Sequence, residues 1–285
     1  MVPPLVSVVC LCYDHQQFVE EAILSVLNQT YPNIQLIVVD DASNDGSQKI
    51  IEAIAAKNKS IELLFLPDNQ GNCRAFNLAF EKCNGEFIID FAADDVLLPN
   101  RVARGVELLM DKGSDYGVQF GDAELIGKEG TKLGLHSDRF PSHSIPSGDV
   151  YMDVIFRYFI CAPTMLIRRS VLEKLNGYDE ELAYEDFDFW VRASRDFKFC
   201  YLPDALVKRR ILSNSMRSDQ FKKGSPQRHS TLLVCKKILI LNRTQEEHKA
   251  LLKRISYEIK VCLKLFDLKM LSDYYQLRKR VIRLL

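Results

Sequence analysis

Three acidic clusters in the sequence have the residue types and spacing that metal-assisted or general-base chemistry needs. They are Asp40-Asp41, Asp94-Asp95 and Glu185-Asp186, each at the end of a predicted strand or the start of a predicted helix. An isolated acidic pair is more often a turn former or a helix cap, and we interpret Asp45 before Gly46 in this way. Asp94-Asp95 differs, because the helix predicted near Asn100 starts too far along the chain to be capped by it. Two carboxylates at one strand end repel each other unless a cation lies there, so this pair predicts a cation site.

Apolar strand segments alternate with amphipathic helical segments through the first third of the chain. The predicted strands are residues 5–12, 35–39, 61–66 and 86–91, and the predicted helices between them are 16–28, 47–57 and 73–82. Parallel strands need such crossover helices, because a two-residue turn cannot return the chain to a parallel neighbour. The pattern predicts an α/β fold with a mostly parallel central sheet flanked by helices. Ligands bind at the carboxyl ends of such strands, where two of the acidic clusters lie.

The alternation stops after residue 118. Residues 127–148 are rich in Gly, Ser, Pro and His without periodicity, which predicts a long loop over a site. Strand or helix signals return at 163–168, near 170, at 184–195 and at 199–202. From residue 225 the sequence is amphipathic and helical. Of the 38 basic and 38 acidic residues in the chain, 20 and 6 fall in residues 205–285. This basic part needs an anionic partner or pairs with the acidic part.

Composition excludes several classes of protein. The chain is 47% hydrophobic and 27% charged, as expected for a globular protein of 285 residues. Its eight cysteines have no CxxC spacing, so we expect reduced, buried thiols in the cytoplasm rather than a zinc site. The N-terminal segment lacks the basic start and apolar run of a signal peptide, and no apolar run is long enough to span a membrane.

Several motifs, taken together and in order, resemble those of the family-2 glycosyltransferases, which have the GT-A fold. The similar segments are VSVVCLCYDHQQFVEEAILSVLNQTYPNIQLIVVDDASNDGS, NQGNCRAFNLAFEKCNGEFIIDFAADDVLLP and GYDEELAYEDFDFWVRA, within residues 5–203. The resemblance implies a GT-A catalytic domain at residues 1–215, with a nucleotide-binding half at 1–121 and an acceptor half at 122–215. A basic amphipathic helical extension would follow at 216–285.

The resemblance also implies a nucleotide-sugar donor site. Tyr13 would stack on the base, and Asp41 would accept a hydrogen bond from it, which suits the imide N–H of uracil. Asp94 would contact the ribose, and Asp95 would bind the Mg²⁺ or Mn²⁺ that bridges the diphosphate. The full predicted donor set is Tyr13, Asp14, Asp41, Arg74, Asp94 and Asp95.

The sequence departs from the family pattern at three places. Ala92 stands where many relatives have an acid, so the metal site has fewer carboxylates. Phe76 stands where relatives often have Arg, and Arg74 is the candidate to replace it. Relatives often have a histidine near KRRILSNS, and here Lys208, Arg209 or Arg210 would neutralise phosphate charge instead, with a solvated basic surface as the equal alternative.

The third acidic cluster supplies the expected catalytic base. In the resembled family, Asp186 would remove the proton from the acceptor hydroxyl while the metal ion acts as Lewis acid on the diphosphate. A base opposite the leaving group implies a single displacement with inversion. Glu185 would help to orient the site or acceptor. Trp190 is assigned either to the surroundings of the acceptor or to the packing of its helix into the core.

Two other functions are weighed against this one. A nucleotidyltransferase would need a glycine-rich phosphate loop after the first strand, and CYDHQQF has no glycine. A non-catalytic adaptor would not need Asp41, Asp94, Asp95 and Asp186 together.

The expected partners are a nucleotide sugar, with a UDP-sugar favoured by its frequency in the family, and a glycan or lipid-linked acceptor of a bacterial cell-envelope pathway; no nucleic acid is expected. The C-terminal helices would pack on the catalytic domain, form a homodimer, or contact the anionic inner face of the plasma membrane.

Overall fold

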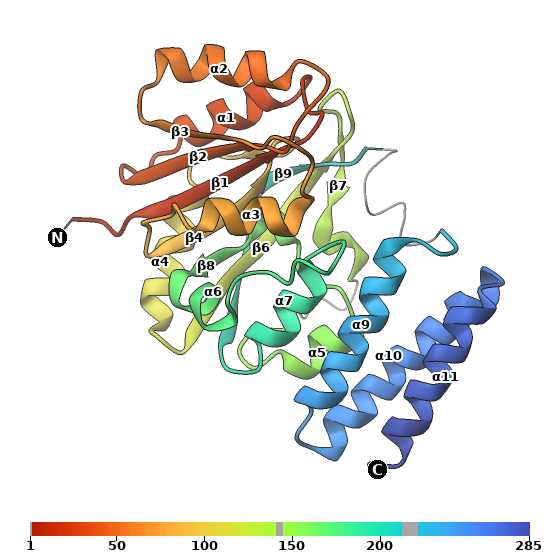
Figure 1. Ribbon diagram of the computed structural model, residues 1–285. Helices are drawn as coiled ribbons and strands as arrows, with labels where there is room; N and C mark the ends of the chain where they lie inside the picture. The colour runs from red at the N-terminus through yellow and green to blue at the C-terminus, as the bar shows by residue number, and fades with distance from the viewer. Residues whose placement is uncertain (1, 141–144, 213–221) are drawn as a thin grey trace.

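The computed structural model describes residues 2–140, 145–212 and 222–285. The 215/216 boundary predicted between the catalytic domain and the extension lies outside these residues. Within them, nine strands form one sheet in the order β3-β2-β1-β4-β8-β6-β9-β5, with β7 paired to β6. Figure 1 shows this twisted sheet with helices on both faces and three C-terminal helices beside one end.

The first part of the sheet is parallel, as the alternation predicts. Strands β1, β2, β3 and β4 pair in parallel, and helices α1, α2 and α3 make the crossovers. The bounds are β1 (Val6–Cys12), α1 (Val19–Leu27), β2 (Ile34–Asp40), α2 (Ser47–Lys57), β3 (Ile61–Phe65), α3 (Asn72–Phe80) and β4 (Phe87–Ala92). Burial of β1 on both faces explains its continuous apolar sequence.

The second part of the sheet is mixed. Strand β6 (Tyr116–Ile126) runs parallel to the long β9 (Lys198–Arg210), whereas β8 (Leu166–Arg168) is antiparallel to β4 and β6. The two-residue β5 (Val96–Leu97) is antiparallel to the end of β9. The prediction of a loop over residues 127–148 is partly wrong. Strand β7 (Lys132–Leu135) pairs with β6 and is followed by the 3₁₀ helix η1 (His136–Arg139). Residues 141–144 of that segment lie outside the described residues.

Each face of the sheet has its own core. Val8 and Cys10 of β1 face a core with α1, α2 and α4 (Arg101–Lys112), and Val9 and Leu11 face the core on the other side. The second core includes α3 and the remaining catalytic helices, which are α5 (Tyr151–Phe156), α6 (Arg169–Leu175) and α7 (Asp186–Ala193). The 3₁₀ helix η2 (Ala162–Thr164) precedes β8. All eight cysteines are buried and free, as predicted.

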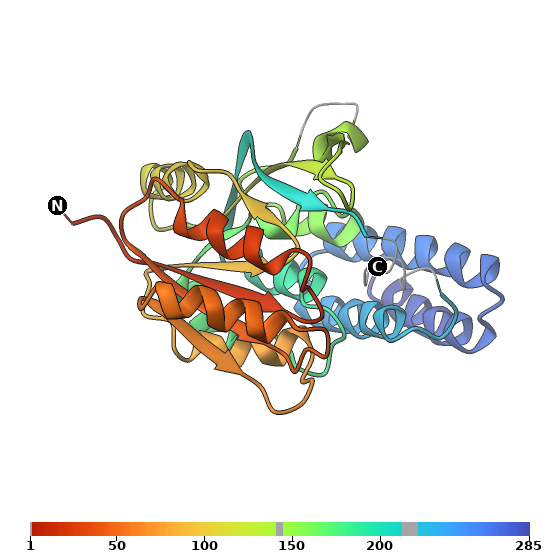
Figure 2. The ribbon, with the colours of Figure 1, turned by 90° about the horizontal axis from the view of Figure 1, so that it is seen from above.

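The C-terminal helices share the second core. They are α9 (Pro226–Leu241), α10 (Gln245–Lys264) and α11 (Leu268–Ile282), which lie side by side against α5 and α7 (Figures 1 and 2). Ser225, Thr244 and Asp267 cap the three helices. Lys237 of α9 reaches Asp188 of α7 at 2.7 Å, so charge pairing joins the extension to the catalytic part. None of the described helices is both long and apolar enough to cross a membrane.

Candidate active site

A cleft of about 180 Å³ opens at the carboxyl ends of β1 and β4. The turn after β4 forms one wall, the start of α7 forms another, and the end of β9 closes it. Its charged lining residues are Asp90, Asp94, Asp95, Glu185, Asp186, Arg209 and Arg210. Two of the three acidic clusters singled out in the sequence therefore face one cavity, although about 90 residues separate them in the chain. This position is the expected ligand site of a parallel sheet.

Asp95 is fixed by β9. Its Oδ1 accepts a hydrogen bond from the backbone N–H of Arg210 at 2.8 Å, and the Arg210 Nε donates to the Asp94 carbonyl at 2.9 Å. Burial raises the pKa of the Asp95 carboxyl well above its ordinary value, and the neighbouring Asp94 raises it further. A cation placed here would favour the charged form of both carboxylates.

The carboxylates of the cleft would fit a metal ion that takes most of its ligands from the bound substrate. Among the described residues, no group of three or more His, Cys, Asp or Glu side chains is arranged to hold a metal. Ala92, named above as a departure from the family pattern, lines the cleft. Mg²⁺ is commonly held by one or two carboxylates plus substrate phosphates. Asp95, with its Oδ2 unbonded to other described residues, can supply one such oxygen.

The predicted base lies at the N-terminal end of α7. Asp186 Oδ1 is buried and has no hydrogen-bond partner within the described parts of the chain. Burial raises the pKa of Asp186 well above its ordinary value, Glu185 raises it further, and Arg209 opposes both. Asn72 Nδ2 donates to Glu185 Oε2 at 2.6 Å and so fixes the residue beside the base. A hydroxyl group entering the cleft would satisfy the bare oxygen of Asp186.

The sequence analysis missed a fifth acid of the cleft, Asp90. Asp90 of β4 lines the cleft, and its pKa is raised, mainly by burial and then by Glu185. Tyr178 donates to Asp90 Oδ2 at 3.1 Å, and its ring stacks on Phe76 at 4.3 Å. Phe76 therefore packs against Tyr178, the residue that hydrogen-bonds Asp90. The signal that could have found this acid was a single carboxylate inside the apolar strand sequence FIIDFA.

Arg209 brings the positive charge to the cleft. Its charge opposes the rise that burial causes in the pKa of both Asp95 and Asp186. Among the described residues, no carboxylate forms an ion pair with it. Arg210 is instead occupied, because its guanidinium bonds Glu21 at 2.8 Å and the backbone of the turn after β6. The sequence offered Lys208, Arg209 and Arg210 as candidates to neutralise phosphate charge. Among the described residues, Arg209 lines the cleft without a carboxylate ion pair, which favours it for contact with an anion.

The predicted base-binding residues lie on the neighbouring loops. Tyr13, 44% exposed, follows β1, and Asp41 follows β2. Asp41 accepts hydrogen bonds from the backbone N–H of Gln70 at 2.7 Å and of Gly71 at 2.9 Å, which ties it to the start of α3. Each carboxylate oxygen retains a further lone pair. Asp14, at a positive φ of 54°, accepts from the Asn44 N–H at 2.7 Å and links the two loops.

Other predicted residues lie farther from the cleft. Arg74 is on the exposed side of α3, 3.9 Å from Glu180, so its position lends no support to donor binding, which stays a prediction. Trp190 is buried and donates from Nε1 to the Met165 sulfur at 3.3 Å. Because Met165 lines the cleft, Trp190 supports its wall from behind.

Asp45, interpreted as a turn former, accepts from the backbone N–H groups of Ser47 and Gln16, as that interpretation requires.

Sequence comparison finds relatives over most of the chain. The sequence model described as "Glycosyl transferase family 2" matches residues 7–175. The putative teichuronic acid biosynthesis glycosyltransferase TuaG of Bacillus subtilis is 26% identical over 220 residues, covering 77% of this chain and 84% of that protein. An uncharacterized glycosyltransferase of Methanocaldococcus jannaschii, MJ1057, is 28% identical over 233 residues, covering 80% and 78%.

Solved structures with the same fold include two nucleotide-sugar complexes. Residues 1–349 of S. aureus TarS with UDP-GlcNAc align with a TM-score of 0.69 and 19% identity, covering 88% of this chain and 71% of that one. The mannosyltransferase PcManGT of Pyrobaculum calidifontis, with GDP-Man and Mn²⁺, aligns with a TM-score of 0.69 and 16% identity, covering 96% and 74%. At these identities the alignments establish the fold, which is GT-A.

Proposed function

Because the chain belongs to glycosyl transferase family 2 and is a glycosyltransferase, we propose that it moves a sugar from a UDP-sugar to an acceptor hydroxyl with inversion. The observation that carries the proposal is the cleft in which Asp94-Asp95 faces Glu185-Asp186. A leaving diphosphate needs its negative charge stabilised, and an attacking hydroxyl needs a base to take its proton. The two walls of the cleft would meet these two needs.

The donor would lie along the carboxyl ends of β1, β2 and β4. Tyr13 stacks on the base, Asp41 accepts from it, and Asp94 meets the ribose. Relatives of this fold bind UDP-GlcNAc and GDP-Man, so a nucleotide diphosphate sugar suits the fold. The acceptor-only carboxylate of Asp41 suits the imide N–H of uracil, and the choice of uridine rests on its frequency in the family. Asp14 supports the donor by holding the loop after β2 in place.

The chemical step would use groups on both walls. The acceptor hydroxyl gives its proton to Asp186 while its oxygen attacks the anomeric carbon and the bond to the diphosphate breaks. The raised pKa of Asp186 makes its anion a stronger base than an exposed aspartate. Glu185, held by Asn72, orients the base. Arg209 neutralises charge on the departing diphosphate. A divalent ion held by Asp95 would supply further Lewis-acid stabilisation of the same leaving group.

Donor binding tests this assignment directly. Titration of UDP-glucose, UDP-GlcNAc and GDP-mannose with Mn²⁺ should give a preference for the uridine donors. Tyr13→Ala should weaken binding roughly 5- to 100-fold, since base–aromatic stacking contributes about 1–3 kcal/mol. Tyr275→Ala is the matched control, because Tyr275 is equally exposed, at 45%, but lies on α11. Equal affinities for both variants would remove Tyr13 from the donor site.

The acceptor is proposed to be a lipid-linked or growing envelope glycan, reached by peripheral membrane contact. Three exposed apolar side chains lie at the end of α10, in the connection and at the start of α11: Leu263 at 52%, Phe266 at 78% and Leu268 at 72%. Lys264 and Lys269 flank them and are exposed. Exposed apolar groups with neighbouring lysines suit the interface of an anionic bilayer, where each lysine contributes about 1 kcal/mol to the binding free energy.

Vesicle binding tests the membrane contact. Deletion of the extension would expose the shared core, so surface substitutions are the better perturbation. The wild type should co-sediment with phosphatidylglycerol vesicles at low salt and less at high salt, and Phe266→Ser with Leu268→Ser should reduce binding at least tenfold. Ile240→Ser is the control, since Ile240 is 80% exposed on α9. Binding that ignores lipid charge or survives the double substitution would refute the contact and leave packing or dimerisation for these helices.

A further inference from the structure

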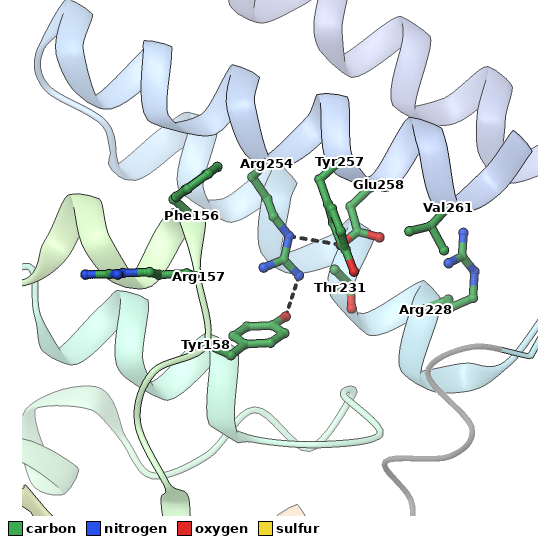
Figure 3. Close-up of a pocket in the computed structure, with 9 residues that line it drawn as sticks. All are labelled: Phe156, Arg157, Tyr158, Arg228, Thr231, Arg254, Tyr257, Glu258 and Val261. Atoms are coloured by element: carbon green, nitrogen blue, oxygen red, sulfur yellow. Dashed lines mark hydrogen bonds and ion pairs between the residues drawn. The ribbon is translucent and has the colours of Figure 1, made fainter. Parts of the chain in front are cut away.

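A second cavity, of about 320 Å³, lies between the catalytic part and the helical extension (Figure 3). The segment after α5 forms one side, with Phe156, Arg157 and Tyr158. Helices α9 and α10 form the other, with Arg228, Arg254 and Tyr257 among the lining residues. Within the described residues, its lining has no member in common with the donor cleft. Nothing in the proposed transfer reaction uses it.

The cavity has three arginines in its wall, and only one is fully paired. Arg254 donates to Glu258 Oε1 at 2.9 Å and to the Tyr158 hydroxyl at 2.5 Å, as the dashed lines in Figure 3 show. Its guanidinium also lies over the Tyr158 ring at 4.5 Å. This group is therefore satisfied by the protein alone.

The other two arginines lack close carboxylate partners. Arg228 is only 3% exposed, yet its Nε has no hydrogen-bond partner among the described residues, and its nearest carboxylate, Asp267, is 4.0 Å away. Its remaining contact is with the Cys262 sulfur. Arg157 is 3.9 Å from Asp153. A buried guanidinium is costly unless its N–H groups are bonded, so the unbonded Nε of Arg228 is the group in this wall that would gain most from a further anionic oxygen.

The mouth of the cavity is apolar. Phe156 is 52% exposed and Tyr257 is 51% exposed, and Val261 lines the wall beside them. Lys253 lies over the Phe156 ring at 5.8 Å and adds positive charge outside. An occupant must therefore combine anionic oxygens, which the buried Arg228 would bond, with an apolar group against the aromatic rings.

We infer that this cavity binds a phosphate carried on an apolar chain. Phosphate oxygens match the fork of guanidinium N–H donors, and a short alkyl or prenyl segment matches the aromatic mouth in polarity. A bilayer phospholipid and a prenyl-linked phosphate both have this chemistry, and their relative affinities for the cavity distinguish them.

Residues of the cavity wall contact the residues on either side of Glu185-Asp186 in the chain. The Tyr158 hydroxyl lies 3.3 Å from that of Tyr184, which in turn lies 2.8 Å from Thr231 Oγ1 in the cavity wall. Tyr158 also packs its ring edge-on against Phe187 at 5.2 Å. Tyr184 and Phe187 flank Glu185-Asp186 in the chain. These contacts connect the cavity wall to the segment that holds the proposed base.

Calorimetric titration of the full chain with hexyl phosphate, hexanol and inorganic phosphate tests the inference. Hexyl phosphate should bind roughly 10- to 100-fold more tightly than either fragment alone, because the charge-assisted bonds and the apolar contact act together. The single tryptophan, Trp190, lies 5.7 Å from the Tyr158 ring, so its fluorescence should change on binding. Equal affinity for hexyl phosphate and hexanol, equal affinity for hexyl phosphate and inorganic phosphate, or no binding at millimolar concentration would overturn the inference.

Two variants and a control locate the binding. Arg228→Met should weaken hexyl phosphate roughly 10- to 100-fold, and Val261→Phe should block the cavity without removing a charge. Arg243→Ala is the control, since Arg243 is exposed and outside the lining. Donor binding should be unchanged in all three folded proteins, which separates this site from the donor cleft. Unchanged hexyl phosphate affinity in folded Val261→Phe would refute the site even if Arg228→Met failed to fold.

Comparison of farnesyl diphosphate with dihexanoyl phosphatidylglycerol, both below their micelle concentrations, identifies the source. Tighter binding of the first indicates a prenyl-linked phosphate, and tighter binding of the second indicates a bilayer lipid. Failure of both to compete with hexyl phosphate would count against either source and against the inference.

Discussion

Replacement of Arg209 by glutamine should separate charge stabilisation of the leaving group from the rest of catalysis. Arg209 faces Asp95 and Asp186 and, among the described residues, forms no ion pair that would hold its charge elsewhere. Loss of one such preorganised donor costs roughly 10²–10³ in kcat, or about 2.7–4 kcal/mol of transition-state stabilisation. Arg209→Gln should therefore lower kcat by this factor, and Arg209→Lys, which keeps the charge, should restore part of it.

The same substitution should change the pH profile in a defined direction. Arg209 lowers the pKa of Asp186, so its removal lets burial and Glu185 raise that pKa further. The base must be deprotonated to act, and the acidic limb of the kcat/KM profile of Arg209→Gln should move to higher pH.

Nucleoside diphosphate release, measured from pH 5 to 9, provides the assay, with Lys208→Gln as the control. Lys208 is the adjacent cation on β9 and lies outside the cleft lining. Equal kcat values for the two glutamine variants, or an acidic limb that stays in place, would refute the role of Arg209.

Three further predictions concern other parts of the molecule. Asp95→Ala should abolish transfer and weaken nucleotide-sugar binding in Mn²⁺, and undiminished activity would remove the metal assignment. Asp186→Asn should keep donor affinity while transfer falls roughly 10²–10⁴-fold, whereas a collapse of donor affinity would make Asp186 a donor ligand. Leu251→Ala, at a fully buried position of α10, should destabilise the whole protein by about 2–5 kcal/mol. Circular dichroism and Trp190 fluorescence should then report one coincident unfolding transition, since the helices share the catalytic core; two separate transitions would contradict that shared core.

The parallel part of the fold was predictable because each of its elements carries its own periodic signal. Strand β1 is buried on both faces and reads as one apolar run, and α1 and α2 have apolar residues at helical spacing. The mixed part was harder to predict. Strand β5 has two residues and β8 has three, too few for any period, and β7 is exposed along half its length. These strands exist because β4, β6 and β9 offer them hydrogen-bonding edges, which sequence periodicity does not encode.

The acidic pairs of the site were predictable from their positions at strand and helix ends. The choice of Arg209 over Arg210 was not predictable from the sequence. It depends on the fold, in which Arg210, and not Arg209, bonds Glu21 and the backbone of the turn after β6. Asp90 was missed because a carboxylate inside an apolar strand gives no periodic signal. Its role in the site became evident from its place in the cleft and from the hydrogen bond that it accepts from Tyr178, which stacks on Phe76.

The most direct test of the central claim follows a UDP-α-sugar and the wild-type protein by proton NMR with Mn²⁺ and water or a simple glycoside as acceptor. Inverting transfer from this cleft predicts release of UDP and first appearance of the β-configured product, with both lost in Asp186→Asn. Release of UMP with a sugar phosphate would instead indicate nucleotidyl chemistry. An α-configured first product, or the same rate in Asp186→Asn, would contradict single displacement with Asp186 as the base.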